Sequence, residues 1–272
     1  MLNILKTVIL GIIEGITEWL PISSTGHLII ADEFIKLNMS DEFMEMFNVV
    51  IQLGAILAVV VIYFKQMWPF SLKKQEHYIK KDVFSMWFKV IVAILPAAII
   101  GIPFDDLFEE KFHNYIVVAL ALIIYGVAFL VVEKRNHKLT PKVNSISEIT
   151  YKTAFLIGCF QALSLIPGTS RSGSTILGAI LIGVSRVAAA EFSFYMAVPV
   201  MFGASFIKLL KFGFNFTSEE FVILAVGMLT AFAVSIVAIK FLMSYIKKRD
   251  FTAFGYYRIV LGIIVLLYFV LK

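Results

Sequence analysis

Six predominantly apolar segments, each about as long as a lipid bilayer is thick, dominate this chain. They cover residues 43–64, 84–102, 115–132, 187–210, 221–246 and 251–271. A helix needs roughly 20 apolar residues to cross a hydrocarbon core of about 30 Å. Charged residues make up only 16% of the chain, which excludes an ordinary soluble domain. We therefore predict an all-α polytopic membrane protein in which residues 1–272 form a single integral membrane domain.

The charges between these segments predict which connections face the cytoplasm. Cations follow the first, third and fifth segments, at Lys65, Lys73, Lys74, Lys80, Lys81, Lys134, Arg135, Lys138, Lys142, Lys247, Lys248 and Arg249. By the positive-inside rule these three connections are cytoplasmic. Acidic residues instead precede the first segment and separate the second from the third, at Asp32, Glu33, Asp41, Glu42, Asp105, Asp106, Glu109 and Glu110. The formal charge of +5 is therefore a topology signal, and we expect no nucleic-acid partner.

Two further apolar stretches are interrupted by serine-rich loops and are too short to cross the membrane twice. The first consists of residues 2–20, a loop at 21–26 and a return at 27–37; the second has a loop at 167–173 and a return at 174–184. Because the fourth segment must leave from the cytoplasm, residues 151–185 have to begin and end on that side. Polar backbone survives at membrane depth only inside protein or beside a wet cavity. We expect two re-entrant hairpins whose loops form a site.

The two hairpins resemble each other in sequence. At an offset of 147 residues, without a gap, Gly11 faces Gly158, Glu14 faces Gln161, Thr17 faces Ser164, Ser23 faces Ser170 and Gly26 faces Gly173. Each half then contains one hairpin and three crossings, with boundaries at about residues 1–146 and 147–272. Since three is an odd number, the halves are expected to form an inverted-topology repeat, which places broken helices near the membrane midplane.

Glu14 and Glu18 precede the loop of the first hairpin. Their i, i+4 spacing places both carboxylates on one face of a helix, and a carboxylate in hydrocarbon is costly unless it faces water or a partner. They are candidate ligands of a divalent cation, Mg²⁺ or Ca²⁺, which prefers oxygen ligands, or candidates for acid–base catalysis. The alternative is that one of them pairs with Arg171 or Lys6.

Arg171, in the second loop, is a candidate anion clamp. A guanidinium offers a planar fork to phosphate oxygens, and hydroxyls at a helix N-terminus supply further donors. Candidates for substrate positioning in the two loops are Ser23, Thr25, Ser170, Ser172, Gly173 and Thr175.

His27 lies at the start of the first return helix, directly after a run of hydroxyls. The positive end of a helix favours a neutral imidazole, which can attack phosphorus or accept a proton. Gln52 lies with Asn48 and Glu45 in a polar stripe on the first crossing segment. We predict that Gln52 contacts substrate, with helix packing as the alternative. The other histidines, His77, His113 and His137, lie in expected loops.

These residues resemble the undecaprenyl-diphosphate phosphatase family known for bacitracin resistance. The matching motifs are Glu-Gly-Ile-Thr-Glu at 14–18, Ser-Ser-Thr-Gly-His at 23–27, Val-Val-Ile-Gln-Leu-Gly at 49–54 and Pro-Gly-Thr-Ser-Arg-Ser at 167–172. Length and hydropathy agree along the whole chain. The resemblance implies removal of the terminal phosphate from undecaprenyl diphosphate, which recycles the lipid carrier for peptidoglycan and other envelope polymers.

Carried over by motif position, the resemblance implies a role for each residue. Glu14 and Glu18 bind a divalent cation or assist acid–base chemistry, Arg171 clamps the diphosphate, and His27 and Ser24 are rival nucleophiles. We expect a polyprenyl diphosphate lipid as substrate and a bacterial inner membrane as location, with the active site facing the periplasmic or extracellular side. A homodimer is a family expectation. The competing hypothesis is a transporter or flippase for a phosphorylated polyprenyl lipid, because inverted repeats with broken helices are a transporter architecture.

Overall fold

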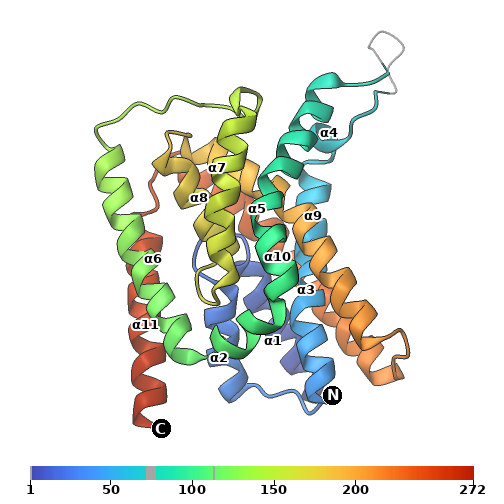
Figure 1. The fold of residues 1–272 in the computed structure, drawn as a ribbon. Coiled ribbons are helices and arrows are strands. Elements are labelled where there is room, and N and C mark those ends of the chain that lie inside the picture. Colours follow the sequence, from blue (N-terminus) through green and yellow to red (C-terminus); the bar gives the residue numbers. More distant parts are fainter. Residues whose placement is uncertain (1, 72–77, 113) are drawn as a thin grey trace.

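The computed structural model describes residues 2–71, 78–112 and 114–272, with the side chains of residues 105, 106 and 109 excepted. Expectations for the side chains of Lys73, Lys74, His77, His113, Asp105, Asp106 and Glu109 therefore lie outside the described residues. In the described ranges the regular structure is helical, and β-structure is limited to two isolated bridges (Figure 1).

Six described helices are long and apolar enough to cross a membrane, which confirms the prediction of an all-α multi-pass membrane protein. They are α3 (Asp41–Ile62), α5 (Lys81–Phe112, with its apolar part at Lys81–Phe104), α6 (Tyr115–Asn136), α9 (Arg186–Phe212), α10 (Ser218–Ile246) and α11 (Thr252–Leu271). The ends of the six predicted segments fall within four residues of these spans. Two short elements, α4 (Phe64–Met67) and the 3₁₀ turn η1 (Ile146–Glu148), lie in connections.

Four shorter helices form two hairpins. α1 (Leu2–Thr17) is followed by α2 (Ser24–Phe34), and α7 (Tyr151–Ala162) with the 3₁₀ turn η2 (Leu163–Leu165) is followed by α8 (Arg171–Leu181). These α-helices contain 16, 11, 12 and 11 residues. All four fall short of the roughly 20 residues that a crossing needs.

The predicted ends of the hairpin helices are wrong by three residues. α1 ends at Thr17, whereas the apolar pattern predicts a helix to residue 20, and α2 and α8 each begin three residues before their predicted starts. The reason is capping, since the side chains of Ser23 and Ser170 accept hydrogen bonds from the backbone N–H groups of Gly26 (3.3 Å) and Gly173 (3.1 Å). A capping serine begins a helix in polar sequence, where an apolar pattern gives no signal.

The hairpin helices pack closely against long helices. α1 contacts α10, and α7 contacts α5. A Cβ on Gly15 of α1 would lie 2.8 Å from the carbonyl oxygen of Ala231 in α10, and one on Gly158 of α7 would lie 2.1 Å from that of Ala93 in α5. Backbones approach this closely only where glycine is present. Elsewhere α6 packs against α11, and α3 packs against both α9 and α10.

The turns of both hairpins lie in the middle of the molecule, away from the ends of the long helices (Figure 1). Trp19, in the first turn, is fully buried and meets the ring of Phe194 in α9 edge-on at 5.2 Å. Ile22, in the same turn, is also buried. The apolar core therefore holds the polar residues of the turns in place.

Candidate active site

The two hairpin turns have the same local structure. Ser23 and Ser170, which cap α2 and α8, both have a positive φ, 73° and 72°. A positive φ is uncommon outside glycine and persists only when the surroundings hold it. Thr25 lies half-buried in the first turn of α2. The first N–H groups of each helix have no helical carbonyl to bond, and two such N-termini favour an anion between them.

Hydrogen bonds join the two turns directly. Ser172 Oγ donates to the carbonyl oxygen of Glu18 at 3.1 Å. Arg171 Nη2 donates to Glu18 Oε1, also at 3.1 Å. The structure therefore brings predicted residues of both loops into contact, across separations of 153 and 154 residues in the sequence.

Glu18 lies at the centre of this contact. Its Oε2 accepts a hydrogen bond from Ser24 Oγ at 3.0 Å, while its Oε1 accepts from Arg171. The side chains of Glu18 and Arg171 are only 9% and 11% exposed. A carboxylate that accepts from a serine hydroxyl can also take its proton. The arrangement is therefore suited to activating Ser24.

Glu14 lies one turn before Glu18 and is fully buried. Neither of its carboxylate oxygens has a hydrogen-bond partner in the part of the chain that the structure describes, and its charged neighbours are Glu18 and Arg171. Buried charges are normally paired or bound to metal. The described side chains include no group of three or more His, Cys, Asp or Glu that could hold a metal ion. A cation here would take its remaining oxygens from phosphate or water.

Arg171 is held by several groups at once. Its Nη1 donates to the carbonyl oxygen of Ser193 at 2.8 Å and to the Ser193 hydroxyl at 3.3 Å. Thr175 Oγ1 lies 2.7 Å from the same hydroxyl, and the guanidinium lies 5.8 Å from the ring centre of Trp19. The ion pair between Arg171 and Glu18 matches the alternative prediction, in which one of the two glutamates pairs with Arg171. Its role as an anion clamp stays a prediction.

His27 forms a separate set of contacts. Its Nδ1 lies 2.7 Å from the carbonyl oxygen of Ser23, and its Nε2 lies 2.7 Å from the hydroxyl of Tyr257 in α11. The rings of His27 and Tyr257 are 8° from parallel, with centres 5.5 Å apart. The hydrogen bonds described for His27 include none to Ser24. Its role as nucleophile or base stays a prediction.

The predicted polar stripe on α3 makes its contacts away from the turns. Gln52 Nε2 donates to the carbonyl oxygen of Asn48 in the same helix at 3.3 Å. Glu45 forms an ion pair with Lys208 of α9. Among the described hydrogen bonds and ion pairs, none joins these residues to the hairpin turns. Substrate contact by Gln52 stays a prediction.

Like Ser193 of α9, Arg258 of α11 is a buried site residue that was not predicted. Its Nη1 donates to the carbonyl oxygen of Pro21 at 3.1 Å, and its Nη2 donates to those of Gly168 and Thr169, each at 2.9 Å. A Cβ on Gly173 would lie 3.0 Å from Nη1, so a small residue leaves room for the guanidinium. One side chain thus fixes both turns. The signal is present in the sequence, since Arg258 is the only charged residue in the apolar stretch 251–271.

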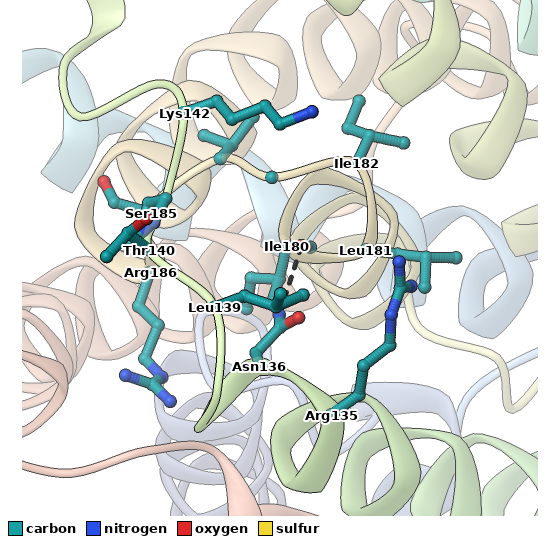
Figure 2. A pocket seen from close by; sticks show the side chains of 13 residues that line it. Arg135, Asn136, Leu139, Thr140, Lys142, Ile180, Leu181, Ile182, Ser185 and Arg186 are labelled. Carbon is teal, nitrogen blue, oxygen red and sulfur yellow. Dashed lines mark hydrogen bonds between the residues drawn. The ribbon is translucent and has the colours of Figure 1, made fainter.

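A cavity of about 330 Å³ lies elsewhere, between the end of α6, the connection that follows it and the turn from α8 to α9. Figure 2 shows Arg135, Lys142 and Arg186 around it, with Asn136 donating to the carbonyl oxygen of Ile180 at 3.2 Å. Its lining includes no residue of the hairpin turns. This cavity is therefore separate from the candidate active site.

Comparison with known proteins agrees with the motifs. Residues 7–264 match the family model described as "Bacitracin resistance protein BacA". The chain belongs to the BacA family. A relative in Acetivibrio thermocellus, named undecaprenyl-diphosphatase, is 64% identical over 99% of this chain and 98% of its own length. Relatives with the same name in Enterococcus faecalis (64% identical, 98% and 97% covered) and Lachnoclostridium phytofermentans (61% identical, 99% and 98% covered) are similar throughout. Membership of the BacA family confirms the resemblance drawn from the two serine-rich loops.

Proposed function

We propose that this chain is an undecaprenyl-diphosphatase. It removes the terminal phosphate of undecaprenyl diphosphate and returns undecaprenyl phosphate to the synthesis of peptidoglycan and other envelope polymers. Bacitracin resistance, the property in the family's description, is the expected phenotype. Family membership and the name of the relatives support the proposal. The structural observation that carries it is the meeting of Glu18 with Ser24 and Arg171 beside two helix N-termini.

The diphosphate binds where the first turns of α2 and α8 meet. The N–H groups of these turns and the guanidinium of Arg171 donate to phosphate oxygens. The positioning hydroxyls are those of Ser23, Thr25, Ser170, Ser172 and Thr175. Arg171 gives up part of its pairing with Glu18 to the incoming phosphate. In-line positioning and neutralisation of charge supply most of what phosphoryl transfer requires.

Two nucleophiles are compatible with these contacts. Ser24 already donates to Glu18, so Glu18 takes the hydroxyl proton as Ser24 attacks the terminal phosphorus, and undecaprenyl phosphate leaves with the bridging oxygen. Water then attacks the phosphorus, phosphate leaves, and Ser24 regains a proton. His27 would instead attack through Nε2 or take a proton from water. Full turnover in Ser24→Ala would exclude the serine route, and phosphate trapped on His27 in a quenched reaction would establish the histidine route.

A divalent cation, Mg²⁺ or Ca²⁺, fits the carboxylates of Glu14 and Glu18. The fit rests on the buried oxygens of Glu14, for which the described residues supply no donor, beside a second carboxylate. When bound, the cation would offset the negative charge that carboxylates and phosphates bring together. The chain itself holds both carboxylates on one helix face, through the packing of Gly15 against α10.

The proposed membrane arrangement is an inverted repeat of residues 1–146 and 147–272, each with one re-entrant hairpin and three crossings. It is supported by the matching contacts of α1 with α10 and of α7 with α5, and by the shared positive φ of Ser23 and Ser170. With the cationic connections in the cytoplasm, the site opens to the outer side of the bacterial inner membrane. The isoprenoid tail of the substrate then lies along apolar helix surfaces.

A transporter or flippase for a phosphorylated polyprenyl lipid is the second candidate function. The paired hairpins favour it, because broken helices meeting at the midplane suit alternating access. It gives no reason for a serine hydroxyl held on a buried carboxylate. Movement of the lipid between leaflets of proteoliposomes without phosphate release would support it. A homodimer is a separate proposal, which cross-linking in native membranes tests.

Release of phosphate from a long-chain polyprenyl diphosphate by the purified protein tests the proposed function. We expect release that stops with EDTA and in Arg171→Ala. Arg135→Ala, which removes an exposed arginine beside the separate cavity, is the matched control and should keep wild-type turnover. Absence of release from folded wild-type protein in lipid would contradict the proposal.

A further inference from the structure

α11 contributes a second residue to the first turn, directly before Arg258. The hydroxyl of Tyr257 lies 2.7 Å from His27 Nε2, and the two rings lie almost parallel. Tyr257 is 46% exposed. None of the steps proposed above uses Tyr257.

The hydrogen bonds of His27 determine which ring nitrogen carries the proton. The carbonyl oxygen of Ser23 can only accept, and it lies 2.7 Å from Nδ1. In the neutral ring the proton is therefore on Nδ1, and Nε2 has a free lone pair. The hydroxyl of Tyr257, at 2.7 Å, is then the donor to Nε2.

We infer that Tyr257 is a positioning residue that fixes the orientation of the His27 ring, with Nε2 as the acceptor nitrogen. Nδ1 is occupied as a donor to Ser23, so Nε2 is the nitrogen available for attack or for taking a proton. The inference rests on the proposed function where it concerns turnover. Where it concerns the histidine itself, it rests on the geometry alone.

Arg258 fixes the part of α11 that carries Tyr257 against the two turns. It follows Tyr257 in α11 and bonds the carbonyl oxygens of Pro21 and Gly168. Tyr256, which precedes Tyr257 in the same helix, is 60% exposed. α11 therefore presents one tyrosine to the histidine and keeps its neighbour away from the turns, which supplies a matched control.

Nitrogen NMR of the lipid-free full chain, labelled with ¹⁵N-histidine, tests the inference without substrate. At about pH 8, above the ordinary histidine pKa of about 6.5, we expect one histidine with its proton on Nδ1, absent from the spectrum of His27→Gln. Tyr257→Phe keeps the ring but removes the donor, so the Nε2 signal should shift. Tyr256→Phe should leave it unchanged. A proton found on Nε2, or an unshifted signal in Tyr257→Phe, would overturn the inference.

Kinetics of the same variants test the link to turnover. Loss of one neutral hydrogen bond predicts a fall in kcat of roughly tenfold in Tyr257→Phe, with KM within about twofold of wild type. Tyr256→Phe should match wild type in both. An unchanged kcat in Tyr257→Phe would overturn the positioning role. Inactive wild-type protein with the expected NMR signals would count against the proposed function and leave the histidine geometry standing.

Discussion

Two glutamate–arginine pairs in this protein are built differently. Glu133 of α6 is 1% exposed, and both of its oxygens accept from Arg186 Nε, at 3.0 and 3.1 Å. Its Oε1 also accepts from the backbone N–H of Phe251 at 3.0 Å. At the hairpin turns, Glu18 accepts one hydrogen bond from Arg171 and one from Ser24. There Arg171 Nε has no partner among the described atoms.

The difference separates a structural pair from a functional one. Glu133 joins α6 to the starts of α9 and α11, and its acceptor positions are filled by protein donors. The pair at the turns leaves donors and acceptors unused, which costs stability in a buried site. Groups left unused in this way are available to a ligand. We therefore expect Glu133 and Arg186 to control stability, and Glu18 and Arg171 to control turnover.

Arg171→Ala should have the largest effect on turnover. Removing a preorganised charge from the site of phosphoryl transfer typically lowers kcat by about 10²- to 10³-fold. The melting temperature in detergent should fall by less than in Glu133→Gln, because Glu18 and Arg171 share one hydrogen bond whereas Glu133 and Arg186 share three. Steady-state phosphate release and a thermal melt measure the two quantities. Turnover within tenfold of wild type would show that the pair of Glu18 and Arg171 is structural, like the pair of Glu133 and Arg186.

Glu133→Gln should give the opposite pattern. Breaking a buried ion pair by changing one partner costs roughly 3 kcal/mol, so the melting temperature should fall while kcat at low temperature stays within a few fold of wild type. Glu18→Gln is the matched control and should lose turnover, with a smaller fall in melting temperature than Glu133→Gln. The comparison would be inverted if Glu18→Gln melted earlier than Glu133→Gln.

Arg258→Lys should have an intermediate effect on turnover. An ammonium group has no planar fork and cannot reproduce the three hydrogen bonds to both turns, so we expect kcat to fall by about tenfold to a hundredfold. Arg249→Lys, in the connection between α10 and α11, is the control. Equal kcat values in the two variants would show that the turns keep their geometry without the guanidinium.

Asp250→Asn should have the smallest effect. Burial acts to raise the pKa of Asp250, but hydrogen bonds from the backbone and side chain of Thr252, and from His137, hold this pKa below its ordinary value. A lowered pKa in the folded state contributes stability above the ordinary pKa and loses it as the pH falls through the folded value. The variant should melt about 2 °C earlier at pH 7. This difference should shrink as the pH falls below the ordinary aspartate pKa of about 3.9, and a constant difference would exclude the carboxylate as its source.

The long helices and the residues of the two loops could be predicted because their signals are local. Apolar length determines the spans. Ser24, Glu18 and Arg171 lie in short motifs of the two serine-rich loops, and these loops meet as predicted. Helix starts were harder, because Ser23 caps α2 by accepting a hydrogen bond from the backbone N–H of Gly26, inside a polar stretch. Such a cap has no hydropathy signal.

Arg258 and Tyr257 could not be placed by the same reasoning. The partners of Arg258 lie 237, 90 and 89 residues away in the sequence, and the partner of Tyr257 lies 230 residues away. Contacts at such distances depend on how α11 packs against the hairpins. The sequence shows a charge in the apolar helix, but it does not show which distant residues that charge contacts.

Arg258 also makes the two turns depend on one another. α6 has no charge before Glu133, whereas α11 carries Arg258 well inside the helix. Two turns with the same local structure are therefore tied together by one guanidinium from one long helix. A single substitution at position 258 would loosen both turns at once, so the chain has a single point of failure for the geometry of its candidate active site.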